Sequence, residues 1–102
     1  MMTTIAPSHA VLAEWNILIN VTDGTENFVG YDENIMLGRM STAIIKFNEE
    51  KGEGRTFSGS TYKTQGAAGK LHADALYVIE HVLAGRNIEY EWKYPVQGVK
   101  GE

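Results

Sequence analysis

The sequence contains no cysteine and no long apolar run. The absence of cysteine excludes disulfides, thiolate nucleophiles and Cys-ligated zinc or iron–sulfur sites, and it fits a reducing compartment. No apolar run approaches the roughly 20 residues that span a bilayer as a helix, so we expect no membrane segment. Residues 1–10 have neither a basic region nor a long apolar core. We therefore expect no secretory signal and a cytoplasmic protein.

Positive charge is also scarce. The 102 residues include nine Lys and Arg against 13 Asp and Glu, which gives a net charge of −4. Nucleic-acid affinity rests mainly on cations that neutralise phosphates. A net negative charge therefore argues against direct nucleic-acid binding, although an acidic chain can still carry a local basic strip. Between Glu14 and Glu53, eight acids against three bases give −5. An acidic first half suits a basic protein partner; the alternative is that the acids only keep the protein soluble.

The length predicts a single domain. A hydrophobic fraction of 43% and a charged fraction of 22% are typical of a folded globule and argue against disorder. We expect one α+β domain over residues 1–102, with flexible ends at about 1–10 and 96–102.

Alternation of apolar and polar residues predicts most of the strands. It is clearest in residues 15–21, which predict a half-buried strand with Trp15, Ile17, Ile19 and Val21 on the buried face and Asn16 and Asn20 on the other. The Asp23-Gly24 pair that follows is a strong hairpin signal leading into a second strand, 26–31. Residues 35–47 fit helical spacing as well as alternation, and we favour a strand over 41–48 there. Two more strands are expected over residues 55–62 and 88–94.

One amphipathic helix of roughly four turns is expected after a glycine-containing loop at 66–69. An apolar stripe runs through residues 71–83, and Asp74, Tyr77 and His81 lie on the opposite face. The expected element order is therefore ββββαβ. It predicts an antiparallel sheet of four to five strands with one helix packed on one face.

The loop before this helix offers a candidate ligand site. Gly66, Gly69 and Lys70 precede a helix N-terminus, where free amides favour an anion. A phosphate-binding P-loop needs a glycine where Thr64 stands and a Ser or Thr where Leu71 stands, so that motif fails. The loop also spells the GxxG of KH RNA-binding modules, but it follows a predicted strand instead of a helix. A small-ligand or nucleotide-binding module using this loop is the alternative function, beside a plain connection.

No group of residues indicates catalysis or a metal. His72 and His81 are nine residues apart, so they do not share the i, i+4 face of a zinc-binding helix. Ser58 lies in a stretch that lacks the first glycine of a GxSxG elbow. Adjacent acids such as Asp32 and Glu33 point in different directions and make a weak acid–base pair. We expect no enzyme, no cofactor and no metal.

Several features of layout carry a resemblance to a known group. They are Met1-Met2-Thr3, an early strand and turn, Gly30-Tyr31-Asp32-Glu33-Asn34, and Gly52-Glu53-Gly54 before a strand and a glycine-led helix. In these the chain resembles small phage proteins that disable host defences, in particular type I anti-CRISPR proteins. The resemblance implies binding to a nucleic-acid-handling protein of a bacterial host, in some cases by acidic mimicry of DNA, with no chemistry.

We therefore expect a non-catalytic acidic binding protein that inhibits a host nucleic-acid-handling complex. Its partner would be a basic protein or nucleoprotein complex, without direct nucleic-acid or membrane contact. A homodimer is also compatible, because an open sheet has edges available for pairing. The expected interface comprises acids of the loops and one helix face: Asp23, Glu26, Asp32, Glu33, Glu49, Glu50, Glu53, Asp74, Tyr77 and His81.

Overall fold

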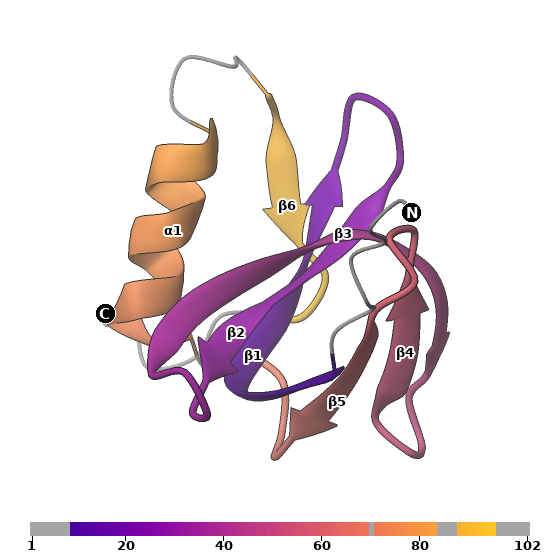
Figure 1. Ribbon diagram of the computed structural model, residues 1–102. Helices are drawn as coiled ribbons and strands as arrows, with labels where there is room; N and C mark the ends of the chain where they lie inside the picture. The colour runs from indigo at the N-terminus through magenta and orange to yellow at the C-terminus, as the bar shows by residue number, and fades with distance from the viewer. Residues whose placement is uncertain (1–8, 70, 84–87, 96–102) are drawn as a thin grey trace, which may run out of the picture.

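The protein is a mostly β domain with one short helix (Figure 1). The computed structural model describes residues 9–69, 71–83 and 88–95. Five strands come first: β1 (His9–Asn20), β2 (Glu26–Asp32), β3 (Leu37–Asn48), β4 (Glu53–Thr56) and β5 (Thr61–Gln65). The helix α1 (Ala73–Leu83) and the strand β6 (Tyr90–Trp92) follow.

The first five strands close on themselves as a small barrel. Each strand from β2 to β5 is antiparallel to the one before it, and β5 then pairs with the first half of β1. The pairing of β1 with β2 completes the ring. An up-and-down ring with an odd number of strands brings its first and last strands together in parallel, so β1 and β5 are parallel. Beyond β5, the same edge of β1 pairs with β6.

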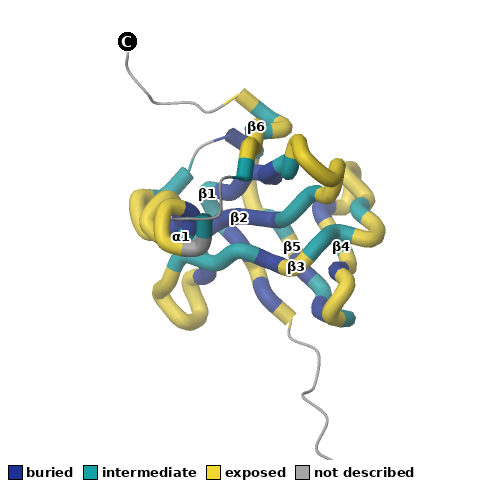
Figure 2. The backbone as a smooth tube through the Cα atoms, turned by 90° about the horizontal axis from the view of Figure 1, so that it is seen from above, coloured by how far each residue is buried: buried dark blue, intermediate teal, exposed yellow. Residues whose placement is uncertain are grey.

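Two apolar clusters lie on the two sides of the barrel wall. The inner cluster fills the barrel, and its buried members are Ala10, Leu12, Trp15, Ile17, Phe28 and Tyr62. The outer cluster lies between the wall and α1, and its buried members are Leu18, Val29, Ala75 and Ile79. Neighbouring residues on one strand point to opposite sides, so Ile17 and Leu18 belong to different clusters. Figure 2 shows the buried positions of β1 and β2 in the middle of the molecule, with α1 on one side and β4 on the other.

The helix packs closely on the start of β3 because Gly38 has no side chain. A methyl group on Gly38 would lie 2.3 Å from the carbonyl oxygen of Asp74 and 2.6 Å from the Cα atom of Ala75. The buried stripe of α1 includes Ala75 and Ile79, as the periodicity predicts. The first turn of the helix is therefore fixed against the β2–β3 hairpin.

Several predicted elements are confirmed. Residues 15–21 fall largely within β1, 26–31 fall within β2, and 41–48 fall within β3. The helical alternative for 35–47 is wrong, because β3 pairs with both β2 and β4 along this stretch. β1 begins at His9, inside the range expected to be flexible, whereas residues 1–8 and 96–102 lie outside the described part of the chain.

Other expectations need correction. Residues 55–62 are not one strand, because a turn at 57–60 containing Gly59 at a φ of 88° separates β4 from β5. The order is therefore five strands, the helix and a sixth strand, and the sheet is mixed instead of antiparallel. The helix has 11 residues, about three turns at 3.6 residues each. The last strand has three residues instead of the seven expected over 88–94.

The exposed face predicted for residues 15–21 is also wrong. Trp15 and Ile17 share a face as expected, but Asn16 and Leu18 are buried as well. A bulge precedes these residues: Glu14 has a φ of 47°, and the register with β2 shifts between Ala13 and Asn16. The second face of β1 is then covered by α1, β6 and the residues after β6.

Candidate binding surfaces

Four of the predicted acidic residues are spread over three turns, and the others lie in β2, β4 and α1. Asp23 lies in the β1–β2 turn, Glu33 in the β2–β3 turn, and Glu49 and Glu50 in the β3–β4 turn. Figure 1 shows these turns at separate corners of the molecule. The acids of these three turns therefore do not share one continuous face, whereas mimicry of a DNA backbone would require one.

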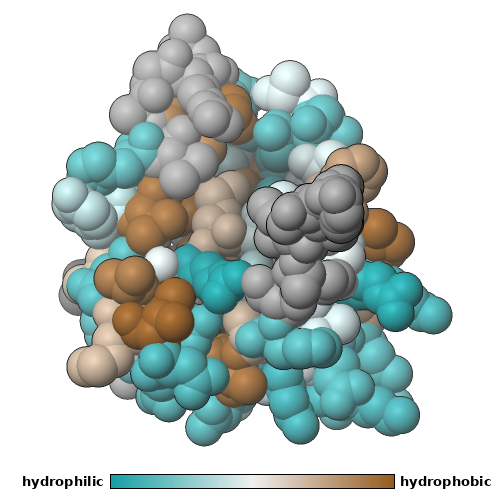
Figure 3. Space-filling view, viewed as in Figure 1, coloured by the Kyte–Doolittle hydropathy of each residue, from teal (hydrophilic) through white to brown (hydrophobic). Residues whose placement is uncertain are grey.

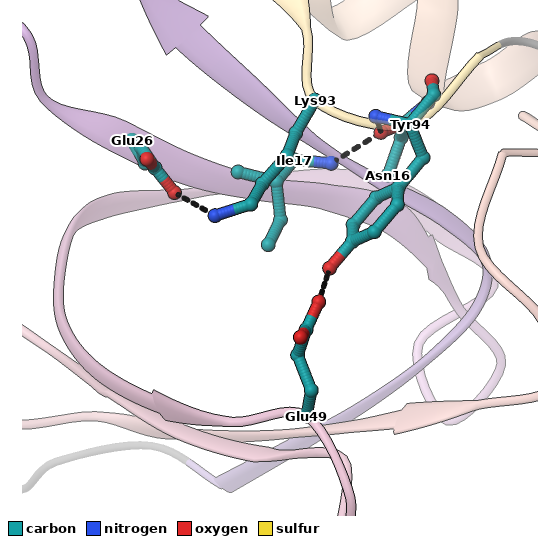
Figure 4. Close-up of polar contacts among 6 residues, drawn as sticks. All are labelled: Asn16, Ile17, Glu26, Glu49, Lys93 and Tyr94. Atoms are coloured by element: carbon teal, nitrogen blue, oxygen red, sulfur yellow. Dashed lines mark hydrogen bonds and ion pairs between the residues drawn. The ribbon is translucent and has the colours of Figure 1, made fainter.

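Two of the predicted acids bind the segment that follows β6 (Figure 4). Lys93 Nζ lies 3.1 Å from Glu26 Oε1, and the Tyr94 hydroxyl donates to Glu49 Oε2. Burial of this hydroxyl, its hydrogen bond to Glu49 and the charges of Glu49 and Glu26 raise the pKa of Tyr94 to about 12. Both carboxylates therefore already have partners within the chain.

Asn16 fixes the same segment from β1. Its side chain is fully buried, its Nδ2 donates to the Tyr94 carbonyl at 2.8 Å, and its Oδ1 accepts from Tyr94 N at 3.2 Å. Lys93 N also donates to the Ile17 carbonyl at 2.8 Å. The Asn16 side-chain amide thus pairs with both the N–H and the carbonyl of Tyr94, as a neighbouring strand's backbone would.

Asp32 is the one acid of the predicted interface that is buried, with 2% of its surface exposed. Its Oδ2 lies 3.1 Å from Arg39 Nη1, and its Oδ1 accepts from the backbone N–H of Asn34 at 3.0 Å. An aspartate that accepts from the amide two residues on forms an Asx turn. Asp32 therefore shapes the β2–β3 turn, while the neighbouring Glu33 is exposed.

The β2–β3 turn presents three consecutive apolar side chains to solvent. Ile35, Met36 and Leu37 are 51%, 70% and 57% exposed, and we call these residues the apolar turn. Met36 has a φ of 57°, which a non-glycine residue rarely adopts. Figure 3 shows brown side chains at the lower left, where Figure 1 places the start of β3 and the first turns of α1. Sequence reasoning missed this surface because the same residues also fit a helical pattern.

The predicted helix face lies next to this turn. Asp74, Tyr77 and His81 are all exposed on α1. The rings of Tyr77 and His81 are 4.0 Å apart between centroids, and His81 Nδ1 donates to the Tyr77 carbonyl at 2.9 Å. The contact of Gly38 with Asp74 places this acid beside the start of β3. Together, Glu33 and Asp74 form what we call the acidic rim of the apolar turn.

Two backbone groups of the loop proposed for ligand binding are hydrogen bonded to Trp15. Gly69 N donates to the Trp15 carbonyl at 2.9 Å, and Trp15 Nε1 donates to the Gly66 carbonyl at 3.0 Å. A backbone amide of the first turn of α1 donates to His72 Nδ1 at 3.0 Å. Lys70 lies outside the described residues. A ligand site in this loop stays a prediction.

Four basic side chains gather in a cleft of about 640 Å³ on the outer face of the barrel. They come from β3, the β3–β4 turn, β4 and β5: Lys46, Lys51, Arg55 and Lys63. We call this the basic cleft, and Figure 3 shows a largely hydrophilic surface over β4. The sequence signal that could have indicated this cleft is alternation, because three of these cations alternate with inward-facing residues along their strands. Strand register is needed to bring them together, and the sequence alone did not supply it.

Comparison of this chain with protein-family models, with curated proteins and with solved structures finds no match. Within the described residues, no group of three or more His, Asp or Glu side chains is placed to hold a metal ion. Over the same part of the chain, no helix is long and apolar enough to cross a membrane. The fold defines a small α+β domain, and its surfaces carry the evidence for function.

Proposed function

We propose that the protein is a non-catalytic binding module that docks onto a partner protein through the apolar turn and its acidic rim. The observation that carries this proposal is the exposure of three consecutive large apolar side chains, Ile35, Met36 and Leu37, at 51–70%. Contiguous exposed apolar surface with a polar border is typical of protein interaction sites.

The turn is held in place before any partner binds. The Asp32 carboxylate ties the turn to Arg39 and to the Asn34 amide. Met36 keeps a positive φ, a strained state that persists only where the surroundings impose it, and such states cluster at functional sites. A preorganised turn loses little conformational entropy on binding, which favours affinity.

The acidic rim selects the kind of partner. Glu33 precedes the apolar turn along the chain, with only Asn34 between them. The backbone of Asp74 lies against Gly38, which follows the turn. Both acids are exposed and would face cations at the edge of the partner's pocket. We propose a basic component of a nucleic-acid-handling complex, in which the bound module would cover surface that the nucleic acid needs. The resemblance to anti-CRISPR proteins supports the same target class, whereas the dispersed acids favour docking over mimicry of DNA.

The proposal is tested by capturing partners from bacterial lysate with the tagged protein and two variants. Met36→Gly removes the central apolar side chain while keeping the positive φ that glycine accepts readily. Phe57→Ser is the matched control, because Phe57 is a 79% exposed apolar residue in a different turn. We expect a stoichiometric nucleic-acid-handling protein to be retained by the wild type and by Phe57→Ser but lost with Met36→Gly. Equal retention by both variants, or no retained protein at low salt, would contradict the proposal.

The rim is tested in the same experiment. Charge reversal with Glu33→Lys and Asp74→Lys should weaken retention, and raising the salt concentration should weaken it for the wild type. Urea unfolding of each variant confirms that the fold is intact. Retention that is insensitive to both reversals would show that the partner is not selected by charge.

A further inference from the structure

The basic cleft is built from two rows of side chains on the outer face of the barrel. In one row, Lys46 of β3 faces Arg55 of β4, and Arg55 faces Thr61 of β5. Thr61 is paired in turn with His9 of β1, whose Nδ1 is hydrogen bonded to the Thr61 hydroxyl. The second row, two residues along each strand, comprises Asn48, Glu53, Lys63 and Val11.

The cleft holds uncompensated positive charge. Four cations and a single carboxylate, Glu53, line it. Glu53 faces Lys63 across the strands, but Lys46 faces another cation, Arg55. Like charges directly opposite each other destabilise a strand pair. Among the described residues, none of the four cations lies within ion-pair distance of a carboxylate.

This concentration is not explained by the composition of the chain, whose net charge is −4. The two other cations that the structure describes are both neutralised: Arg39 pairs with Asp32, and Lys93 pairs with Glu26. The described cations thus fall into two groups, those paired within the chain and those in the cleft. An anion in the cleft would relieve the repulsion between Lys46 and Arg55.

We propose that the basic cleft is a binding site for the phosphate groups of a small phosphorylated ligand. A volume of about 640 Å³ lies within the range of small-molecule sites. Arginine and lysine hold phosphate oxygens with charge-assisted hydrogen bonds, and the Thr61 hydroxyl adds a neutral polar group. Two rings line the cleft: that of Tyr62 is only 5% exposed, whereas the exposed imidazole of His9 is hydrogen bonded to the Thr61 hydroxyl. Recognition in the cleft therefore rests on its contacts to phosphate oxygens.

The site lies apart from the surface proposed for the partner protein. Lys46 follows Leu37 by nine residues along β3, up to about 30 Å at the rise of an extended strand. Binding at one surface can therefore be tested without changing a residue of the other.

The test is a titration of the wild type with inorganic pyrophosphate, followed by calorimetry and by backbone amide NMR shifts. We expect the largest shifts in β4, β5 and the end of β3. Arg55→Gln and Lys46→Gln should each weaken binding about tenfold or more, the effect of losing one charge-assisted contact. Lys93→Gln is the matched control, because it removes one exposed cation outside the cleft, and it should leave the affinity unchanged.

Three results would overturn the proposal. The first is the absence of cleft shifts at ~1 mM pyrophosphate, a concentration that corresponds to a weak affinity even for a small ligand. The second is an equal loss of affinity in Lys93→Gln. The third is binding of a single-stranded oligothymidylate without binding of pyrophosphate, which would indicate an extended nucleic-acid surface. Arg55→Glu guards against misfolding, because it turns the like-charge pair with Lys46 into an opposite-charge pair. That variant should stay folded and lose pyrophosphate binding.

Discussion

Arg39 donates from Nη1 to Oδ2 of Asp32 at 3.1 Å across the base of the β2–β3 turn. The same guanidinium lies over the ring of Tyr62, 5.4 Å from its centroid, inside cation–π range. The pair therefore connects the exposed apolar turn to a residue of the barrel core. We expect this link to restrict the motion of the proposed docking surface.

Replacing Asp32 with alanine should lower the free energy of unfolding by about 2–4 kcal/mol, somewhat below the range for breaking a fully buried pair. The cause is a partly buried Arg39 without a counter-ion and an Asn34 amide without an acceptor. Urea unfolding measures the change. Asp32→Asn is the control, because it keeps an acceptor for the turn and should be less destabilising. An Asp32→Ala variant as stable as the wild type would contradict the role of the pair.

Asn16→Leu tests the attachment of the segment after β6. The substitution keeps a side chain of similar size but removes the partners of both Tyr94 backbone groups. We expect a loss of about 2–4 kcal/mol, since each buried polar group left without a partner costs about 1–3 kcal/mol. Hydrogen exchange at Tyr94 should also become faster. Asn34→Ala, at an exposed turn position, should change stability little; a similar loss there would contradict the assignment.

Local periodicity was enough to predict β1, β2 and most of β3, and the buried stripe of the helix. Trp15 and Ile17, or Ala75 and Ile79, show the expected spacing because their burial depends on one element facing one core. The parallel pairing of β1 with β5 depends on closure of the ring, which no short window of sequence encodes. Asn16 is buried for the same kind of reason, since the segment that covers it is 78 residues away in the chain.

The candidate sites divide in the same way. Exposure of Asp74 and Tyr77 follows from helix periodicity alone. The basic cleft could not be predicted, because Lys46 and Lys63 come together only once the register of β3, β4 and β5 is known. Treating residues 55–62 as one strand also concealed the turn that places β5 beside β4. The composition gives the number of acidic residues, but it does not indicate that Asp32 is buried.

The raised pKa of Tyr94 predicts a loss of stability at high pH. Its pKa is raised from 10.0 to about 12 in the folded protein, so the folded state favours the neutral hydroxyl. This contribution is fully present below pH 10 and is lost as the pH rises through about 12. Tyr94→Phe should therefore be less stable than the wild type at pH 8, with the difference disappearing near pH 12. Urea unfolding at both pH values measures this. An ultraviolet difference titration in which Tyr94 ionises near pH 10 would contradict it.

Gly38→Ala should detach α1 from the barrel. The new methyl group would lie 2.3 Å from the Asp74 carbonyl oxygen, and the atoms in its way are backbone atoms that cannot rotate aside. We expect a loss of about 2–3 kcal/mol or more, at the upper end for overpacking, and a change in the fluorescence of Trp92, which packs in the cluster beneath the helix. Gly66→Ala separates this contact from backbone strain, because Gly66 has a φ of 80° but open space around it. That control should lose only about 1–2 kcal/mol, the strain of a left-handed residue, without the fluorescence change. Equal losses and unchanged fluorescence in both variants would show that α1 does not depend on this close approach.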